Sequence, residues 1–362
     1  MSQFPASILI VLHDFSLGGT ERVATRLAAV WAAKGVHVTV FAGSNDGPLR
    51  VLAGDDVEVV IADPPIPRSR GSRARLARAA RAFVAARRFD GVFVPGNYHW
   101  PVAAALSGRG IPVVAQVSAA LDKPQRGRVQ QWAFELRMRR LLRKVEAVVA
   151  LSDVARDQAN RILRRAVATT IALPALGDDV APPTPVPGTQ PAVVLAAGRL
   201  VPEKGFAQLI EAFAMLPAAM ARLVIVGDGP EADTLRRQSE ALGIADRVEL
   251  AGYVADIRPS LDTARVFVLA SDFEGYPAVV VEALAAGRPV VATDCTPATR
   301  LLEAPGAGMV VPLGDSAALA RAIAAMLDRA PPDPVKLAAL VAHHRIGDVA
   351  DAYLDLFAEV RA

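Results

Sequence analysis

The chain of 362 residues contains a single cysteine, Cys295, and only 5% of its residues are aromatic. One cysteine excludes a disulfide framework, a cysteine-rich zinc site and a dithiol redox pair, and it favours a reducing compartment. Because aromatic side chains are scarce, alanine and other small residues must fill much of the core. Apolar types make up 52% of the chain and charged types 21%, so the sequence predicts a globular protein rather than a disordered one.

Long unbroken hydrophobic runs are also missing. The uncharged stretch 91–108 is interrupted by two prolines and several glycines, so it predicts a strand, a turn and a helix rather than a membrane span. The amino-terminal apolar run has no lysine or arginine before it and breaks at His13 and Asp14, which disfavours a secretory signal. We therefore expect a cytoplasmic protein.

Positive charge is concentrated in the first half of the chain. Residues 1–181 contain 25 Lys or Arg against 15 Asp or Glu, whereas the remainder contains 15 against 22. Most of the excess lies in 68–144, where 17 basic residues face three acidic ones. Such runs usually form the solvated faces of helices. Because the excess is confined to one half, solvated helix faces alone explain it less well than a face for a phosphate-bearing substrate or an anionic membrane surface.

Apolar runs alternate with helical spacing through the first half. The run over 7–15 is continuous, as in a strand buried on both faces, and 20–31 has the spacing of a helix with Thr20 as its N-cap. This alternation is typical of a parallel sheet covered by helices on both faces. Further strands are expected over 37–43, 57–62, 91–96, 112–118 and 146–152, and further helices over 72–88 and 126–144.

A proline-rich segment separates this half from a second one in which the alternation restarts. Residues 174–191 contain six prolines and two glycines, which suit neither a helix interior nor a central strand. We predict an α/β fold of two doubly wound Rossmann-like domains that face each other across a cleft. Ligands of such sheets bind beyond the carboxyl ends of the strands. The predicted parts are an N-terminal domain over 1–175, a linker over 176–190, a C-terminal domain over 191–345 and a final helix over 346–362 that packs back on the N-terminal domain.

One motif imitates a dinucleotide site. Residues 227–232 read Gly-Asp-Gly-Pro-Glu-Ala after an apolar strand and fit G-x-G-x-x-A, and Glu249 has the spacing of an acidic ribose ligand. However, Pro230 lies inside the pattern and the unit lies in the middle of its domain. A tight structural turn explains the motif as well, so a NAD-binding oxidoreductase is an alternative rather than the favoured interpretation.

Two cations, Arg199 and Lys204, lie in the loop between an apolar strand and the helix that begins near Phe206. Arginine binds a phosphate through two hydrogen bonds, lysine acts as a point charge, and free amides at a helix N-terminus add donors, so the loop suits a diphosphate. A plain surface loop in which Arg199 pairs with Glu203 explains the spacing equally well.

Two carboxylates flank the turn at Pro277, which we expect at the first position of the next helix. Glu274 lies in the loop before that helix and Glu282 on its second turn, while the amides of Ala278 and Val279 point out of its N-terminus. Carboxylates accept from hydroxyls and amides donate to phosphate, so this set suits a hydroxyl-rich anionic ligand. A capping Glu plus a surface Glu is the alternative, but it leaves Glu282 unexplained in a largely apolar helix.

Two strand ends in the first half carry weaker candidates. Gly18 and Gly19 precede a helix and allow close approach of the backbone to a ligand, although an ordinary turn explains them too. His99 follows the strand at 91–96 and is a candidate to hydrogen-bond a sugar or share a proton. His13, at the end of the first strand, is its equal rival by position.

Taken together, these motifs resemble the retaining nucleotide-sugar glycosyltransferases of family four, which have the two-domain GT-B fold. The resemblance covers nearly the whole chain and is most specific over 192–315. It rests on G-G-T-E-R at 18–22, G-R-L-x-x-E-K-G-F at 198–206, V-G-D-G-P-E at 226–231 and E-G-x-P-x-x-x-x-E-A-L-A-x-G-x-P-V-V-A at 274–292. One departure is Thr296-Pro297-Ala298-Thr299, where many members have Gly-Gly-x-x-Glu.

The resemblance implies a role for each candidate residue. Arg199 and Lys204 would hold the donor diphosphate, Glu274 would contact sugar hydroxyls, and Glu282 would bind the ribose. His99 is the nearest match to a histidine that the family carries in its first domain. Backbone contacts would come from Gly275, Tyr276, Pro277, Ala278 and Val279 to sugar and phosphate, from Tyr253 and Val254 to the base, and from Gly18 and Gly19 to donor phosphates or acceptor.

The resemblance also implies a reaction. A sugar would pass from a nucleoside diphosphate sugar, with UDP favoured over GDP, to a hydroxyl with its anomeric configuration retained. The implied acceptor is a saccharide or lipid-linked saccharide in surface polysaccharide or glycolipid assembly, with peripheral association with the inner face of the cell membrane. The chain has no Asp-x-Asp motif, so we expect no metal; no other cofactor and no nucleic-acid partner are expected. A nucleotide-sugar epimerase on the same fold is the second alternative.

Overall fold

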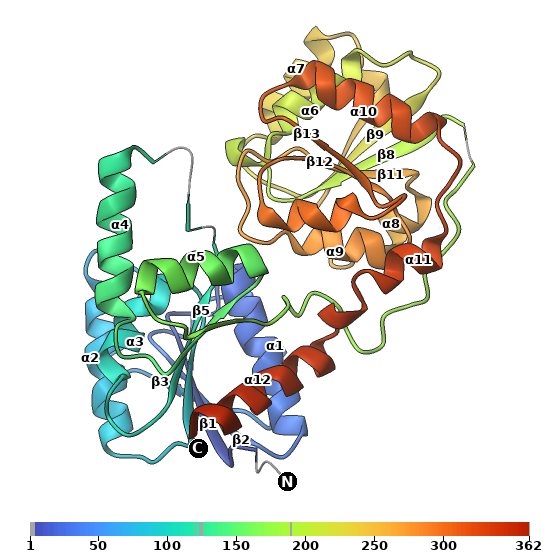
Figure 1. Cartoon of the computed structure of the whole chain (residues 1–362). Helices are drawn as coiled ribbons and strands as arrows, with labels where there is room; N and C mark the ends of the chain where they lie inside the picture. The colour runs from blue at the N-terminus through green and yellow to red at the C-terminus, as the bar shows by residue number, and fades with distance from the viewer. Residues whose placement is uncertain (1–3, 120, 123–125, 189, 362) are drawn as a thin grey trace. The chain divides into compact units, whose positions relative to one another are not determined.

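The computed structural model describes residues 4–119, 121–122, 126–188 and 190–361. Lys123 of the basic region and Thr189 of the predicted linker lie outside these described residues. The chain forms two compact units, one built from 1–178 with 345–362 and the other from 179–344, and each unit has its own sheet (Figure 1).

The first unit contains a seven-stranded parallel sheet in the order β3-β2-β1-β4-β5-β6-β7. The last strand, β7, was not among the predicted ones, because three half-buried residues at a sheet edge are too short for a periodic signal. The strands are β1 (Ser7–Leu12), β2 (His37–Ala42), β3 (Glu58–Ile61), β4 (Gly91–Val94), β5 (Val113–Val117), β6 (Ala147–Ala150) and β7 (Ala168–Thr170). The helices are α1 (Gly19–Ala33), α2 (Ser72–Ala85), α3 (Trp100–Leu106), α4 (Arg128–Leu141), α5 (Asp153–Leu163) and α12 (Ile346–Arg361), with 3₁₀ turns η1 (Pro48–Ala53) and η2 (Asn97–His99).

Helices cover both faces of this sheet. Leu9 and Val11 of β1 belong to the apolar core that α2, α3, α4 and α5 close on one face. On the other face, the buried Trp31 of α1 makes edge contacts with the rings of Tyr353 and Phe357 of α12 and donates its indole N–H to Ala350 O at 3.1 Å. The last helix of the chain therefore completes the core of the first unit.

The second unit contains a six-stranded parallel sheet in the order β10-β9-β8-β11-β12-β13. Two doubly wound α/β sheets are thus confirmed. The strands are β8 (Ala192–Ala197), β9 (Ala221–Val226), β10 (Val248–Gly252), β11 (Val266–Leu269), β12 (Val290–Thr293) and β13 (Gly308–Val311). The helices are α6 (Phe206–Ala214), α7 (Ala232–Ala241), α8 (Arg258–Thr263), α9 (Ala278–Ala285), α10 (Ser316–Asp328) and α11 (Pro334–Ala339), with 3₁₀ turns η3 (Pro202–Lys204), η4 (Ala245–Arg247), η5 (Pro297–Glu303) and η6 (Ala342–His344).

Two predicted helix starts are wrong by one or two residues. Gly18, not Thr20, is the N-cap of α1, where a Cβ would lie 2.2 Å from the Glu21 carboxylate that folds back over it. Pro277 is the N-cap of α9 with extended backbone rather than its first helical residue. An N-cap residue keeps extended geometry while the helix begins after it.

An ion-pair network holds the loops at the carboxyl edge of the first sheet. Asp14 after β1 and Glu21 of α1 are both buried, and Arg68, in the loop after β3, donates to both carboxylates. Burial alone would raise the pKa of Asp14, but hydrogen bonds from Arg68 and Ser16 overcome this and lower it below its ordinary value.

His99 joins the loop after β4 to the end of β1. Its Nε2 accepts from the His13 backbone N–H at 3.0 Å, so Nδ1 carries the proton and donates to Pro95 O at 2.7 Å. The side chain is buried, and burial lowers its pKa to about 4. His99 is therefore a neutral structural residue near pH 7.

The proline-rich segment is attached to the first unit at its start. Arg26 of α1 donates to the carbonyl oxygens of Pro174 and Leu176 at 2.9 and 3.1 Å. Leu176 also forms an isolated bridge with Arg345, where the chain returns to this unit. The first residues of the segment are thus part of the first unit.

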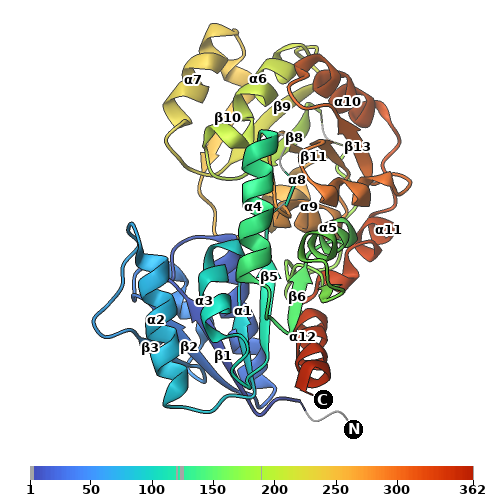
Figure 2. The same cartoon turned by 60° about the vertical axis from the view of Figure 1, so that its left-hand side comes forward.

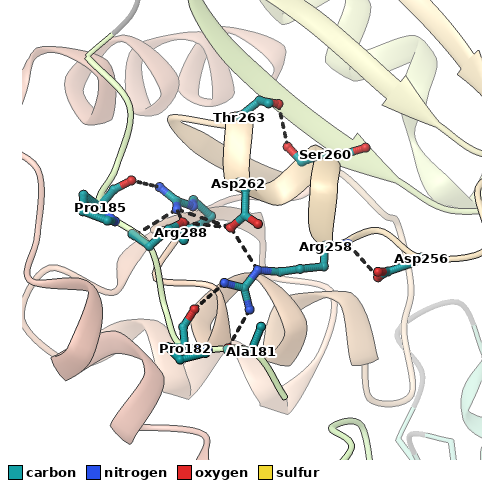
Figure 3. A network of polar contacts seen from close by, with 10 residues as sticks. Ala181, Pro182, Pro185, Asp256, Arg258, Ser260, Asp262, Thr263 and Arg288 are labelled. Carbon is teal, nitrogen blue, oxygen red and sulfur yellow. Dashed lines mark hydrogen bonds and ion pairs between the residues drawn. The ribbon is translucent and has the colours of Figure 1, made fainter. Parts of the chain in front are cut away.

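The later part of the segment is attached to the second unit (Figure 3). Arg288, which is fully buried, donates to the carbonyl oxygens of Thr184 and Pro185 at 2.9 and 3.0 Å. Arg258 donates to Ala181 O at 2.7 Å and pairs with Asp262 at 2.9 Å. Only a short stretch around 179–180 therefore lies between the two attached parts.

We expect Arg288→Ala to lower the free energy of unfolding of the second unit by about 2 kcal/mol, because it removes the donors of two partly buried carbonyl groups and opens a cavity. Denaturant unfolding measures this. The control Arg236→Ala, at an exposed i,i+3 pair of α7, should change stability by at most about 0.5 kcal/mol. Equal effects of the two substitutions would show that Arg288 does not hold the segment.

We also expect the first unit to lose stability as the pH falls from 6.5 toward 4. In this window the unfolded chain binds a proton at His99, whose pKa is about 6.5 when free, while the folded chain does not. The loss reaches about 3 kcal/mol near pH 4. Urea unfolding between pH 7 and 5 measures the slope, and His99→Gln should flatten it by nearly one proton. An unchanged slope in that variant would contradict this assignment.

Candidate functional site

The carboxyl edge of the second sheet brings two of the predicted motifs together. Lys204, at the end of η3 after β8, and Glu274, in the loop after β11, form an ion pair with an Nζ–Oε1 distance of 2.5 Å. The two side chains are 23% and 14% exposed, so the pair is largely withdrawn from water. Lys204 and Glu274, which are 70 positions apart in the sequence, are therefore in contact at the carboxyl edge of the sheet. Parallel sheets bind their ligands at this edge.

Glycine at position 205 makes this approach possible. Gly205 has φ +65°, and a Cβ there would lie 2.0 Å from Ala270 O at the end of β11. The backbone N–H of Asp272 donates to Glu203 O at 2.9 Å, which joins the two loops directly. Lys204 is thus directed toward Glu274 by the backbone around it.

Glu274 is oriented by contacts besides Lys204. Ser271 Oγ donates to the same carboxylate oxygen, Oε1, at 3.0 Å, and the Glu274 backbone N–H donates to Cys295 O at 3.2 Å. Among the described residues, Oε2 has no hydrogen-bond donor. This oxygen is the one left to accept from a ligand hydroxyl.

The neighbouring loop residues are supported from behind. Thr296 Oγ1 donates to Gly275 O at 3.0 Å, and the Tyr276 hydroxyl shares a hydrogen bond of 3.1 Å with Nε2 of the buried His344. Burial raises the pKa of Tyr276, so its hydroxyl stays protonated. Thr296 is therefore a structural support of this loop.

The other predicted donor residues follow strands of the same sheet. Arg199 lies directly after β8 and is exposed, without an ion-pair partner among the described residues, so the alternative pairing with Glu203 is absent. Glu282 is half-buried on the second turn of α9, whose first amides, at Ala278 and Val279, lie at the carboxyl edge. Tyr253 and Val254 follow β10, and Tyr253 is 65% exposed.

The glycines of the dinucleotide-like motif allow its loop to pack closely against the loop that follows β8. A Cβ at Gly227 would lie 1.8 Å from Gly198 O, and one at Gly229 would lie 2.5 Å from Leu200 O. Glu249 is exposed and pairs with Arg222 at 3.1 Å. The motif is therefore explained as a structural turn, and the structure gives no support to a NAD site.

In the first unit, the candidate residues near the ends of β1 and β4 have different surroundings. Gly18 packs against Glu21, whereas Gly19 is exposed with open space where a side chain would be. His99, the candidate catalytic residue, is buried, and both of its ring nitrogens bond backbone groups. His13 is also fully buried, in edge contact with the Tyr98 ring.

Sequence reasoning missed Arg68, Arg73 and Tyr98 at this edge. The guanidinium groups of Arg68 and Arg73 lie 4.8 and 5.3 Å from the centre of the Tyr98 ring, within the range of cation–π contacts. Arg68 is separated by 54 and 47 residues in the sequence from its partners Asp14 and Glu21. No local sequence pattern predicts a pairing over such a distance.

Within the described ranges, no group of three or more His, Cys, Asp or Glu side chains is arranged to hold a metal ion. None of the described helices combines the length and apolar character needed to cross a bilayer.

Comparisons with known proteins match both halves of the chain. Residues 18–175 match the family "Glycosyl transferase 4-like domain", and residues 191–329 match "Glycosyl transferases group 1". These ranges lie in the first and second units, respectively.

Individual relatives match over different lengths. The lipopolysaccharide core biosynthesis glycosyltransferase LpsE of Rhizobium meliloti is 40% identical over 36% of this chain and 38% of its own, and LpsD of the same organism is 33% identical over 46% and 49%. The chain thus spans less than half the length of these two relatives. The phosphatidyl-myo-inositol mannosyltransferase of Mycobacterium leprae is 32% identical over 88% of this chain and 86% of its own.

Solved structures share the fold. HepE of Anabaena in complex with UDP superposes with a TM-score of 0.76 at 20% identity, covering 98% of this chain and 100% of its own. The lipopolysaccharide outer core galactosyltransferase WaaB gives 0.75 at 18% identity, covering 96% and 98%. With the family matches over both units and the near full-length mannosyltransferase relative, these likenesses show that the chain belongs to the glycosyltransferases of family four and has the GT-B fold.

Proposed function

We propose that this protein is a retaining glycosyltransferase that moves a sugar from a nucleoside diphosphate sugar, with UDP preferred over GDP, to a hydroxyl of a lipid-linked saccharide. The observation that carries the proposal is the Lys204–Glu274 pair beside the N-terminus of α9. The relatives named for lipopolysaccharide core synthesis support a role in surface polysaccharide assembly, and the UDP complex of HepE supports the nucleotide.

The diphosphate is held by positive charge that is in place before the ligand arrives. Glu274 fixes the Lys204 ammonium, so binding a phosphate there requires little further ordering of that side chain. Arg199 adds a planar pair of donors, and the amides of Ala278 and Val279 add the field of a helix N-terminus. No metal or other cofactor is required, because these groups themselves offset the charge of the leaving diphosphate.

The sugar and the nucleoside meet the remaining polar groups. Glu274 Oε2 accepts from the hydroxyls of the transferred sugar, with the backbone of Gly275 and Pro277 beside it. Glu282 accepts from the ribose hydroxyls, and the exposed loop at Tyr253 and Val254 borders the base.

In the reaction, the bond between the anomeric carbon and the diphosphate breaks while the acceptor oxygen forms a bond to the same face of that carbon. The departing phosphate oxygen takes the acceptor proton, so the configuration is retained and the charges balance. Lys204 and Arg199 stabilise the developing negative charge, and such preorganised electrostatics is usually the largest catalytic contribution. Glu274 is not the nucleophile in this proposal, because the acceptor oxygen attacks the anomeric carbon directly and the Glu274 carboxylate accepts from the sugar hydroxyls. His99 has no part in this mechanism.

The acceptor is proposed to be carried by a lipid, at the cytoplasmic face of a membrane. The name of the mannosyltransferase relative contains a lipid, phosphatidyl-myo-inositol, and the basic excess over 68–144 suits an anionic surface. A nucleotide-sugar epimerase is the less favoured candidate. It would form isomers of the sugar nucleotide in the absence of any acceptor, which chromatography of the products detects.

We expect UDP to raise the melting temperature of the chain. At one hundred times its dissociation constant a ligand stabilises the folded state by about 2.7 kcal/mol, which corresponds to roughly 5–10 °C for units of this size. Thermal-shift measurements with UDP, GDP, ADP and NAD compare the ligands, and GDP should give the smaller shift of the two favoured nucleotides. Stabilisation by NAD alone would contradict the site.

We expect Glu274→Ala to lower turnover of a UDP-sugar at least about 100-fold, because the carboxylate contacts the sugar. UDP affinity should change by no more than about threefold, because Lys204 loses its fixed position but keeps its charge. Lys204→Ala should lower both turnover and UDP affinity. Release of UDP measures turnover, and calorimetry measures affinity. The exposed Glu249→Ala serves as the control and should leave both unchanged. Near-normal turnover in Glu274→Ala would refute its role.

A further inference from the structure

Helix α9 is held at both ends by one segment of the second unit, residues 334–344, which forms α11 and η6. Beyond the carboxyl end of α9, a Cβ at Gly287 would lie 2.4 Å from Pro334 Cβ, so the first residue of α11 packs closely on that turn. Before the amino end of α9, the Tyr276 hydroxyl and His344 Nε2 lie 3.1 Å apart. Figures 1 and 2 show α11 beside α9. The segment therefore reaches both ends of this helix.

The contact between Tyr276 and His344 is withdrawn from water. His344 is fully buried, and the centre of its ring lies 5.5 Å from the centre of the Tyr276 ring. Burial keeps the Tyr276 hydroxyl protonated, so this hydroxyl can donate to Nε2 of a neutral imidazole. A polar group that loses its partner in such surroundings is costly, so the hydrogen bond holds the tyrosine in place.

Tyr276 is the middle residue of the turn that carries the proposed donor contacts. On one side of it, Gly275 O accepts from Thr296 Oγ1 at 3.0 Å, and on the other side the buried Pro277 is the N-cap of α9. Glu274 lies two residues before Tyr276, and the first amides of α9 lie two and three residues after it. A shift of Tyr276 therefore moves the carboxylate and the amides together.

We infer that His344 is a positioning residue for the donor, because through Tyr276 it holds the turn 274–278 in the conformation that binds a nucleoside diphosphate sugar. The inference rests on the proposed function and adds to it a buried residue that touches no reactant.

The effect of this bond falls on donor affinity. Without the bond the empty turn has several conformations, and the donor binds only the fraction of molecules that have the competent one. A donor that is already bound orders the turn through its own contacts, so the chemical step then proceeds as in the wild type. A preorganised turn thus lowers the dissociation constant without changing kcat.

Calorimetry of UDP binding to the full chain tests this. Tyr276→Phe removes the hydroxyl and keeps the ring, and it should raise the dissociation constant of UDP about fivefold, the effect of one neutral hydrogen bond. In turnover of a UDP-sugar, KM should rise by the same factor, whereas kcat should change by at most about twofold. In Glu274→Ala, by contrast, kcat falls. A fall in kcat at unchanged KM, or no change in either, would overturn the inference.

Variants of His344 show whether it acts through Tyr276. His344→Gln keeps an acceptor for the hydroxyl and should leave UDP affinity within about twofold of the wild type, whereas His344→Leu should weaken it about fivefold. Adding Tyr276→Phe to His344→Leu should bring no further loss, since both substitutions remove the same bond. A loss of about 25-fold in the double variant would reveal two independent effects and contradict the inference.

Tyr353→Phe is the matched control for lost stability. The Tyr353 hydroxyl accepts from Gln116 Nε2 at 3.0 Å in the core of the first unit, so this substitution also removes one buried hydrogen bond. UDP affinity should stay within about twofold of the wild type, because the site is distant. Equal losses of affinity in Tyr353→Phe and Tyr276→Phe would mean that general destabilisation weakens binding, and the inference would be wrong.

Hydrogen exchange without nucleotide provides a readout that does not depend on activity. The Glu274 N–H donates to Cys295 O and the Val280 N–H donates to Pro277 O, each at 3.2 Å. The exchange of peptides over 273–282 therefore reports the order of the turn.

Exchange of these peptides should be faster in Tyr276→Phe than in the wild type and unchanged in Tyr353→Phe. Unchanged exchange in Tyr276→Phe would overturn the inference whether or not UDP binds. If the wild type binds no UDP while exchange responds as expected, the proposed function is wrong, and the hold of His344 on the turn stands.

Discussion

The ion pair between Lys204 and Glu274 is the contact on which the candidate site depends. It joins the loop after β8 to the loop after β11, and the contact requires Gly205, because any side chain at that position would collide with the end of β11. A lysine paired in this way is fixed in position but keeps its charge. The same contact therefore positions a cation for a diphosphate and leaves one carboxylate oxygen free for a sugar.

The two units use charge differently. In the second unit, the Lys204–Glu274 pair lies at the edge where ligands bind, and Arg288 ties down the entering chain from within. In the first unit, Arg68 is committed to Asp14 and Glu21, and His99 to backbone groups, so these residues hold loops together. Arg140 and Arg143, which have no ion-pair partner among the described residues, lie elsewhere, around the end of α4.

Much of the architecture follows from local patterns in the sequence. Continuous apolar runs predict most of the strands because parallel strands buried on both faces need no alternation, and the motifs around Lys204 and Glu274 predict residues that the structure brings into contact. What could not be predicted depends on distant contacts. The short edge strand β7, the neutral state of His99 and the pairing of Arg68 with two carboxylates each follow from neighbours many residues away. The exposure of Trp132 is of the same kind, because a helical pattern does not say how far a helix projects beyond its sheet.

The attachment of the proline-rich segment has a mechanical consequence. The chain leaves the first unit after Leu176 and re-enters it at Arg345, and a bridge holds these two positions side by side. His344, immediately before the point of return, is bonded to Tyr276, which follows the Gly275 loop. The loop that follows Glu274 is therefore tied, within the second unit, to backbone one residue from the point where the chain returns to the first unit.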